Sequence, residues 1–219
     1  MRYIIMCGGN YTQWQKPRQL IEINGEPIVA RTIRLLRKYG VNDIAISSEN
    51  PAFEQFGVPV LHHDNPWEVY GHDDVSGTWV TCFYPMSEPA CYLLGDVVFS
   101  ENAIQTIINT STDDIEFFAS APPFATEYKK EYAEPFAFKV VNQGYFRLCI
   151  NFVKRYEAQG LFDRPPIAWE LWQVIKHTTL NVIDYSNYTV INDYTCDIDW
   201  ADEVDMFLPY IEEEIIKEN

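Results

Sequence analysis

The sequence predicts an α/β protein, a three-layer α/β/α sandwich on a mainly parallel but mixed sheet. Two observations carry this prediction. Short apolar segments alternate with segments of helical period along most of the chain, which is typical of parallel strands joined by crossover helices. Such crossovers are right-handed, so their helices cover both faces of the sheet.

The first elements follow from local signals. Residues 2–6 form a short apolar run that glycines interrupt, which predicts a buried strand. Residues 19–23 alternate, and Asn24-Gly25 is a turn signal. Pro27 suits the first turn of a helix, and Gly40 ends the apolar residues that follow at helical spacing.

The other elements follow from the same two periods. We predict the remaining strands at 43–48, 58–61, 90–94, 115–120 and 135–141, with extended segments within 180–191. We predict the remaining helices at 77–84, 101–108, 143–156, 167–175 and 201–217. The segment 62–76 is rich in His, Asp, Asn, Pro and Gly and is predicted as a long loop, a length that usually accompanies function or disorder.

Composition excludes several classes of protein. The chain has 219 residues, of which 47% are hydrophobic and 15% aromatic, as expected for one globular domain spanning 1–219. The apolar runs are too short to span a membrane, and the N-terminus does not resemble a signal peptide. Five scattered cysteines favour reduced thiols and a cytoplasmic location.

The charge is unevenly distributed. The formal net charge of −16 disfavours nucleic acid as a partner, because phosphates would be repelled. Seven of the sixteen basic residues lie within the first 40, whereas residues 39–128 contain neither Lys nor Arg. This acidity suits recruitment of Mg²⁺, although a solvated acidic surface that aids solubility is the better explanation for most of it.

The first candidate site is the loop Cys7-Gly8-Gly9-Asn10, which follows the first strand. Ligands of open α/β sheets bind at the carboxyl ends of strands, and glycines allow backbone N–H groups to approach a phosphate. Lys16 and Arg18 follow and can neutralise phosphate charge. Taken alone, the two glycines favour the alternative, a strand-ending turn beside two ordinary surface cations.

Three aspartates form a second candidate site. Asp96 follows Gly95 just beyond the apolar strand 90–94, where a buried acid needs a cation or a capping role. Asp197 and Asp199 are two residues apart, so in an extended segment both carboxylates point to one side. Together the three could bind Mg²⁺ through hard oxygen ligands. The alternative for Asp197 or Asp199 is capping of the C-terminal helix.

These segments together resemble the nucleotidyltransferase superfamily with a Rossmann-like GT-A-type fold. That family includes sugar-1-phosphate nucleotidyltransferases, phosphocholine cytidylyltransferases and molybdopterin guanylyltransferase-like proteins. Its members pass from a first strand into a glycine-rich loop, a Pro-Lys-x-Leu segment and an Asn-Gly-x-Pro helix start. The matching segments here are Ile4–Gly9, Pro17–Leu20 and Asn24–Pro27.

The resemblance continues, in order, to about residue 208. Gly77-Thr78 is similar to a segment near the nucleobase, and Gly95-Asp96 to the metal-binding Gly-Asp. Asp197–Glu203 is similar to the late acidic segment of the family, and Trp169–Leu171 is weakly similar to an acceptor-side segment.

The resemblance implies an Mg²⁺-dependent enzyme that joins an NTP to a phosphorylated small-molecule acceptor, either a sugar-1-phosphate or a phosphocholine-like compound. Residues 1–100 would form the nucleotide-binding half and 101–219 the acceptor-binding half. The implied catalytic residues are Lys16, Arg18 and Asp96. The implied nucleotide-binding residues are Cys7, Gly8, Gly9, Asn10, Lys16, Arg18, Gly77 and Thr78. The implied metal ligands are Asp96, Asp197 and Asp199, and the acceptor-side candidates are Glu134, Lys139 and Glu170.

Two departures keep alternatives open. Gln13 follows Thr12 where the family usually has arginine, and Arg18 stands where it has a lysine. Arginine binds phosphate as a fork rather than as a point charge. A catalytically weak nucleotide-binding module is therefore one alternative hypothesis. The other is a nucleotide-sugar glycosyltransferase of the same fold, although that class needs an Asp-x-Asp after the central strand and Val97-Val98 follow Asp96 here. The sequence predicts no membrane partner and leaves open whether the chain forms a homo-oligomer.

Overall fold

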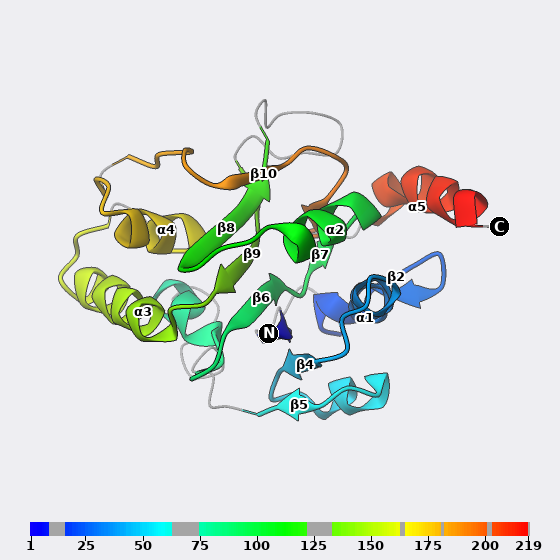
Figure 1. Ribbon diagram of the computed structural model, residues 1–219, viewed down its shortest axis with the longest axis horizontal. Coiled ribbons are helices and arrows are strands. Elements are labelled where there is room, and N and C mark those ends of the chain that lie inside the picture. Colours follow the sequence, from blue (N-terminus) through cyan, green and yellow to red (C-terminus); the bar gives the residue numbers. More distant parts are fainter. Residues whose placement is uncertain are drawn as a thin grey trace.

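A seven-stranded sheet runs through the computed structural model of the protein (Figure 1). Its strands, in chain order, are β1 (Arg2–Met6), β4 (Ile44–Ser47), β5 (Val60–Leu61), β6 (Ala90–Leu94), β8 (Ile115–Ser120), β9 (Pro135–Val140) and β10 (Thr189–Ile191). The structure describes residues 1–8, 16–62, 75–121, 133–162, 165–180, 182–200 and 203–218.

The sheet is mixed, with the spatial order β10-β8-β9-β6-β1-β4-β5. β6, β1, β4 and β5 run parallel to one another, as do β10 and β8. β9 is antiparallel to both of its neighbours, β6 and β8. The predicted fold class, a mainly parallel but mixed α/β/α sandwich, is confirmed.

Helices cover both faces of the sheet. The α-helices are α1 (Ile28–Lys38), α2 (Glu101–Asn109), α3 (Gln143–Ala158), α4 (Ala168–Lys176) and α5 (Val204–Glu218). The 3-10 helices include η1 (Arg18–Leu20), η2 (Pro51–Phe56) and η4 (Val75–Cys82). One apolar cluster joins the sheet to α1 and α2 through Leu35 and Ile104. A second apolar cluster joins other residues of the sheet to α3 and α4 through Phe146 and Trp172.

Two short strand pairs lie outside the main sheet. β2 (Glu22–Ile23) and β3 (Glu26–Pro27) form a hairpin whose turn residues Asn24 and Gly25 have φ values of 51° and 78°, as expected from the Asn-Gly signal. β7 (Val97–Val98) pairs antiparallel with β11 (Cys196–Asp197), which brings the late acidic segment beside the end of β6. This second pair has no counterpart in the sequence-based prediction.

Most predicted elements are observed within one or two residues at each end. Val75 and Ser76, predicted in the long loop, begin η4 instead, and residues 63–74 of that loop lie outside the described residues. The extended segment predicted within 180–191 contains a strand only at β10 in its described part. In the part of the chain that the structure describes, no helix is long and apolar enough to cross a membrane.

Candidate functional site

The carboxyl ends of β1 and β6 lie side by side and define one edge of the sheet. Met6 pairs with Leu94, and the Gly95 amide donates a hydrogen bond to the Met6 carbonyl oxygen at 3.0 Å. A Cβ atom at position 95 would lie 2.3 Å from that oxygen and 2.9 Å from Cys7 Sγ. Glycine is therefore required for the chain after β6 to pack against the end of β1 and to place Asp96 there.

Arg18 joins two of the predicted acidic residues at this edge. Its Nη2 atom donates to Asp96 Oδ2 at 2.6 Å, and its Nη1 atom donates to Asp199 Oδ1 at 2.5 Å. Nη1 also donates to the Ile198 carbonyl oxygen at 2.8 Å. Arg18 is only 4% exposed, so its guanidinium faces the two carboxylates rather than the solvent. The fork geometry of arginine is what allows one side chain to hold two carboxylates from different loops.

The β7–β11 pair positions the later carboxylate. The Ile198 amide donates to the Asp96 carbonyl oxygen at 3.1 Å, which ties the two acidic loops together. Glu203 Oε2 accepts from the amides of Asp199 and Trp200 at 2.7 and 3.0 Å. Glu203 thus holds the local backbone, and the Asp199 carboxylate is directed to Arg18. Asp197 Oδ1 accepts a weak hydrogen bond from Cys196 Sγ at 3.6 Å.

A small pocket opens beside Asp96. It has a volume of about 40 Å³ and is lined by Met6, Gly8, Gln19, Trp79, Cys82, Leu94 and Asp96. We call it the strand-end pocket. Of the residues predicted to bind the nucleotide or the metal, Gly8 and Asp96 line this pocket, at the strand edge where ligands of open α/β sheets bind.

Gln19 is the buried polar residue of the strand-end pocket. It is 2% exposed, and its Oε1 atom has no hydrogen-bond partner among the described residues. A buried amide oxygen without a partner is costly, so this atom is a candidate for contact with a ligand or water in the pocket. Gln19 is not among the site residues predicted from the sequence, because a glutamine in the alternating segment 19–23 carries no local signal of function.

Cys7 lies under the same edge as a neutral thiol. Burial raises the pKa of the Cys7 thiol well above its ordinary value, and the nearby Asp96 carboxylate raises it further. Its amide donates to the Ser47 carbonyl oxygen at 2.9 Å, which extends the β1–β4 pairing by one residue. The side chain therefore serves as an apolar support for the pocket and not as a nucleophile.

The other predicted nucleotide-side residues are distributed around this edge. Lys16 is exposed and precedes Pro17 at the start of η1. Gly77 and Thr78 lie in η4, directly before Trp79, which lines the strand-end pocket. Gly9 and Asn10 lie outside the described residues.

The three acceptor-side candidates are all buried. Lys139 Nζ donates to the carbonyl oxygens of Ile107, Ile108 and Thr110 at 2.8, 3.0 and 2.6 Å, at the end of α2. Glu170 Oε2 accepts from the Ile167 amide at 2.9 Å at the start of α4. Both side chains therefore cap helices.

Glu134 lies nearer to the strand-end pocket than Lys139 does. In the register of β6 and β9, Leu93 pairs with Ala137, so the residues before Pro135 extend past the carboxyl end of β6. The Glu134 amide donates to Ser120 Oγ at 2.8 Å. Lys139 pairs with Cys91, well inside the sheet.

The donor chemistry at Asp96 and Asp199 fits Mg²⁺. No group of three or more His, Cys, Asp or Glu side chains arranged for a metal occurs among the described residues. Two carboxylates nevertheless meet on one guanidinium, which leaves this trio with a net negative charge beside a pocket. Hard oxygen atoms with residual negative charge are the ligands that Mg²⁺ prefers.

The fold is that of known nucleotidyltransferases. One similar solved structure is the 4-diphosphocytidyl-2C-methyl-D-erythritol synthase from Anaerococcus prevotii, with a TM-score of 0.55 and 12% identity over 96% of this chain and 95% of that chain. Another is the CTP:phosphocholine cytidylyltransferase from Streptococcus pneumoniae, with a TM-score of 0.51 and 14% identity over 96% of this chain and 98% of that chain. HddC from Yersinia pseudotuberculosis, in complex with GMP-PN, has a TM-score of 0.51 and 12% identity, over 96% of this chain and 99% of that chain.

Identities this low establish the fold alone, and no curated protein sequence matches the chain. The sequence itself defines the family. Residues 3–147 match the MobA-like NTP transferase domain, which is more than half of the chain. The protein belongs to the MobA-like NTP transferase family and is a nucleotidyltransferase, as the resemblance predicted.

Proposed function

We propose that this nucleotidyltransferase joins an NTP to a phosphorylated small-molecule acceptor, of the sugar-1-phosphate or phosphocholine-like class, and releases pyrophosphate. One observation carries the proposal. Arg18 holds Asp96 and Asp199 together at the carboxyl ends of β1 and β6, beside the pocket that Gly8 and Gln19 line. Ligands of open α/β sheets bind at this edge.

In the proposed reaction, an oxygen of the acceptor phosphate attacks the α-phosphorus of the NTP. A new P–O bond forms as the bond from the α-phosphorus to the bridging oxygen of the β-phosphate breaks, and pyrophosphate leaves with that electron pair. The acceptor oxygen is already ionised at neutral pH, so the protein needs no general base. Its contribution is positioning and charge neutralisation.

The chain's own residues divide this work. Lys16 is exposed, lies two residues before Arg18 and is the proposed phosphate contact. Gly8, with Gly9 and Asn10 after it, presents backbone and amide donors to the nucleotide. Arg18 is proposed as a positioning residue, because its fork is already occupied by the two carboxylates. The proposed location of Gly77 and Thr78 is beside the base, since Trp79 follows them into the pocket.

Mg²⁺ is the proposed metal, held by Asp96 and Asp199, with Asp197 as a further candidate ligand. When bound, it would neutralise phosphate charge at the α-phosphorus. Arg18 keeps the two carboxylates close together before any metal binds. Metal binding therefore does not have to overcome their mutual repulsion.

The acceptor is proposed to lie on the side of the strand-end pocket formed by the second half of the chain. Glu134 supports this location, because it precedes β9 at the level of the carboxyl end of β6. Trp169, beside Glu170, donates from Nε1 to the Ala133 carbonyl oxygen at 2.8 Å, which ties α4 to the same segment.

The test is a pyrophosphate-release assay with CTP, UTP, GTP and dTTP, each with Mg²⁺ and a panel of sugar-1-phosphates and phosphocholine. We expect release with at least one pair, and a loss of at least about 100-fold in Asp96→Asn. Asp43→Asn is the matched control, since Asp43 forms an exposed ion pair with Arg2. Binding of NTP without release from any acceptor would favour the weak binding module. Full activity in Asp96→Asn would refute the metal assignment.

A further inference from the structure

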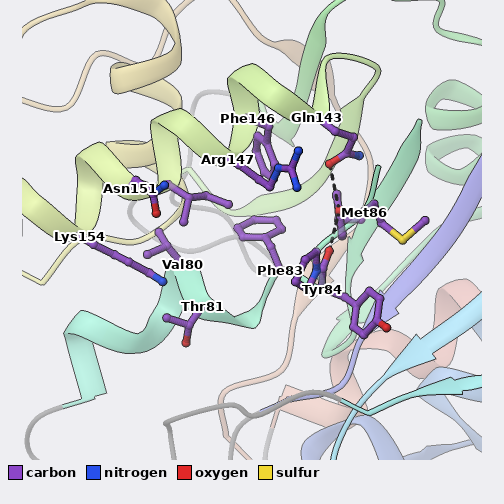
Figure 2. A pocket seen from close by; sticks show the side chains of 13 residues that line it. Val80, Thr81, Phe83, Tyr84, Met86, Gln143, Phe146, Arg147, Asn151 and Lys154 are labelled. Atoms are coloured by element: carbon purple, nitrogen blue, oxygen red, sulfur yellow. Dashed lines mark hydrogen bonds between the residues drawn. The ribbon is translucent and has the colours of Figure 1, made fainter. Parts of the chain in front are cut away.

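A second, larger cavity lies between α3 and η4, together with the segment that follows η4 (Figure 2). Its volume is about 460 Å³, within the range of small-molecule sites. It shares no lining residue with the strand-end pocket. Tyr84, Pro85 and Met86 line it shortly before β6 begins, whereas Asp96 follows the carboxyl end of that strand. We call it the α3–η4 pocket.

The floor of the α3–η4 pocket is aromatic and tightly packed. The Phe83 ring contacts Tyr92 and Phe146 edge-on, with centroid distances of 5.2 and 5.0 Å. Tyr92 and Phe146 stack at 5.8 Å. All three residues are buried, so the floor is rigid and preformed. Such a surface favours a flat aromatic or apolar group.

Buried polar groups lie at one end of this floor. The Tyr92 hydroxyl donates to the Tyr84 carbonyl oxygen at 2.9 Å and lies 3.4 Å from Gln143 Oε1. Gln143 is 3% exposed and lines the pocket with Tyr92. A few polar groups on an otherwise apolar floor are what fixes the orientation of a ligand in a typical small-molecule site.

The wall on α3 is basic. Arg147, Asn151 and Lys154 follow one another at spacings of four and three residues, which places them on one side of the helix. Lys154 extends from α3 toward Thr81 on the opposite wall (Figure 2). In the part of the chain that the structure describes, neither Arg147 nor Lys154 forms an ion pair with a carboxylate.

We propose that the α3–η4 pocket binds a small organic phosphate with an aromatic body. Two cations above an aromatic floor, in a chain whose net charge is −16, are complementary to a dianion joined to a flat ring. The arginine fork matches phosphate oxygens, and Asn151 adds a neutral donor between the two cations. The ring would lie on Phe83 and Phe146, with the phosphate toward Arg147 and Lys154.

An occupant would contact a helix that also forms the strand-end pocket. Val80 and Thr81 of η4 line the α3–η4 pocket, whereas Trp79 and Cys82 of the same helix line the strand-end pocket. The two sites are nevertheless separate in their residues. Binding in the α3–η4 pocket can therefore be tested independently of nucleotidyl transfer.

The test uses 2-naphthyl phosphate as the probe and isothermal titration calorimetry as the measurement. We expect saturable binding to the wild-type protein and at least about tenfold weaker binding to the double variant Arg147→Met/Lys154→Met, which keeps apolar stems but removes both charges. Arg155→Met is the matched control, because Arg155 is an exposed α3 cation that does not line the pocket. We expect the control to bind like wild type.

Three further probes assign the chemistry. Inorganic phosphate and 2-naphthol should each bind at least about tenfold more weakly than 2-naphthyl phosphate, since each lacks one half of the recognised group. Equal binding of 2-naphthoate would refute the choice of phosphate over carboxylate. Unchanged binding in the double variant, or absence of wild-type binding at millimolar probe, would overturn the site. Binding should persist in Arg18→Met, and its loss there would place the probe in the strand-end pocket instead.

Discussion

Two buried cations, Arg18 and Lys139, lie in different regions of this protein and differ in their hydrogen-bond partners. Both were candidates for binding substrate, and they are only 4% and 5% exposed. Arg18 is paired with carboxylates from two loops at the carboxyl ends of the strands. Lys139 is paired with three backbone carbonyl oxygens at the end of α2.

The difference shows how the partners of a buried cation indicate its role. The carbonyl groups around Lys139 belong to a helix end that needs donors in any folded state, so this cation stabilises the fold. Asp96, one of the two carboxylates around Arg18, lines a pocket, and the two carboxylates would repel each other without the guanidinium, so this cation organises a site. Burial lowers the pKa of Lys139, because removing its charge from water is costly and the Cys91 thiol offsets this cost only in part.

The largest effect is expected from Arg18→Met. Without the guanidinium, Asp96 and Asp199 lose the group that holds them together, and we expect pyrophosphate release to fall by at least about 100-fold. Arg18→Lys should lie between this variant and wild type, because an ammonium cannot hold both carboxylates as a fork. Arg34→Met is the control, since it breaks the more exposed pair with Glu26. Activity of Arg18→Met within threefold of wild type would contradict the comparison.

A second large effect is expected from Gly95→Ala. The added Cβ meets the Met6 carbonyl oxygen at 2.3 Å, so the loop that carries Asp96 must move. We expect a stability loss of about 1–3 kcal/mol in urea denaturation and a loss of activity of at least about tenfold. Gly144→Ala is the control, because its nearest contact would be 3.8 Å away in α3. Equal stability and activity in the two variants would show that the close contact at Gly95 is not needed to position Asp96.

The variant Lys139→Met distinguishes the structural role of Lys139 from the role of Arg18 at the site. Three carbonyl oxygens at the end of α2 lose their donor, and we expect the free energy of unfolding to fall by about 1–3 kcal/mol. Pyrophosphate release per folded molecule should remain within about twofold, with the acceptor KM unchanged, since KM reports substrate contacts. A raised acceptor KM without a loss of stability would instead support the acceptor-side role predicted from the sequence.

The smallest expected effect is a pH dependence of the free energy of unfolding, caused by a thiol next to Lys139. Its neighbour across the strands, Cys91, is fully buried, and this burial raises the pKa of the thiol from 9.0 to about 12. Above pH 9 the unfolded chain loses this proton while the folded chain keeps it, so stability falls as pH rises from 9 toward 12. The slope from one thiol is at most about 1.4 kcal/mol per pH unit. Urea denaturation at pH 8–10.5 should show a shallower decline in Cys91→Ala, and an identical decline would exclude this thiol as a cause.

Much of the fold could be predicted because its signals are local. The strand at 90–94, the helix that Gly40 ends and the Asn24-Gly25 turn each depend on residues a few positions apart. Their periods and turn preferences are properties of the chain itself.

The candidate site could be predicted only in part. Asp96 and Asp199 were expected to come together, and the structure brings them within reach of one guanidinium. That this guanidinium is Arg18, buried and facing acids rather than phosphate, could not be predicted. Nor could the helix-capping contacts of Lys139 and Glu170, because a charged residue carries no local mark of its partner.

The sequence by itself determined the alternation of strands and helices, the glycines that end them and the family to which they belong. Only the tertiary structure decided which charges meet. Arg18 reaches Asp96 across 78 residues and Asp199 across 181, and the pairing of β7 with β11 makes the second contact possible. Local periodicity predicts which face of an element is buried. Ion-pair partners that are far apart in the sequence depend instead on the order and connection of the strands.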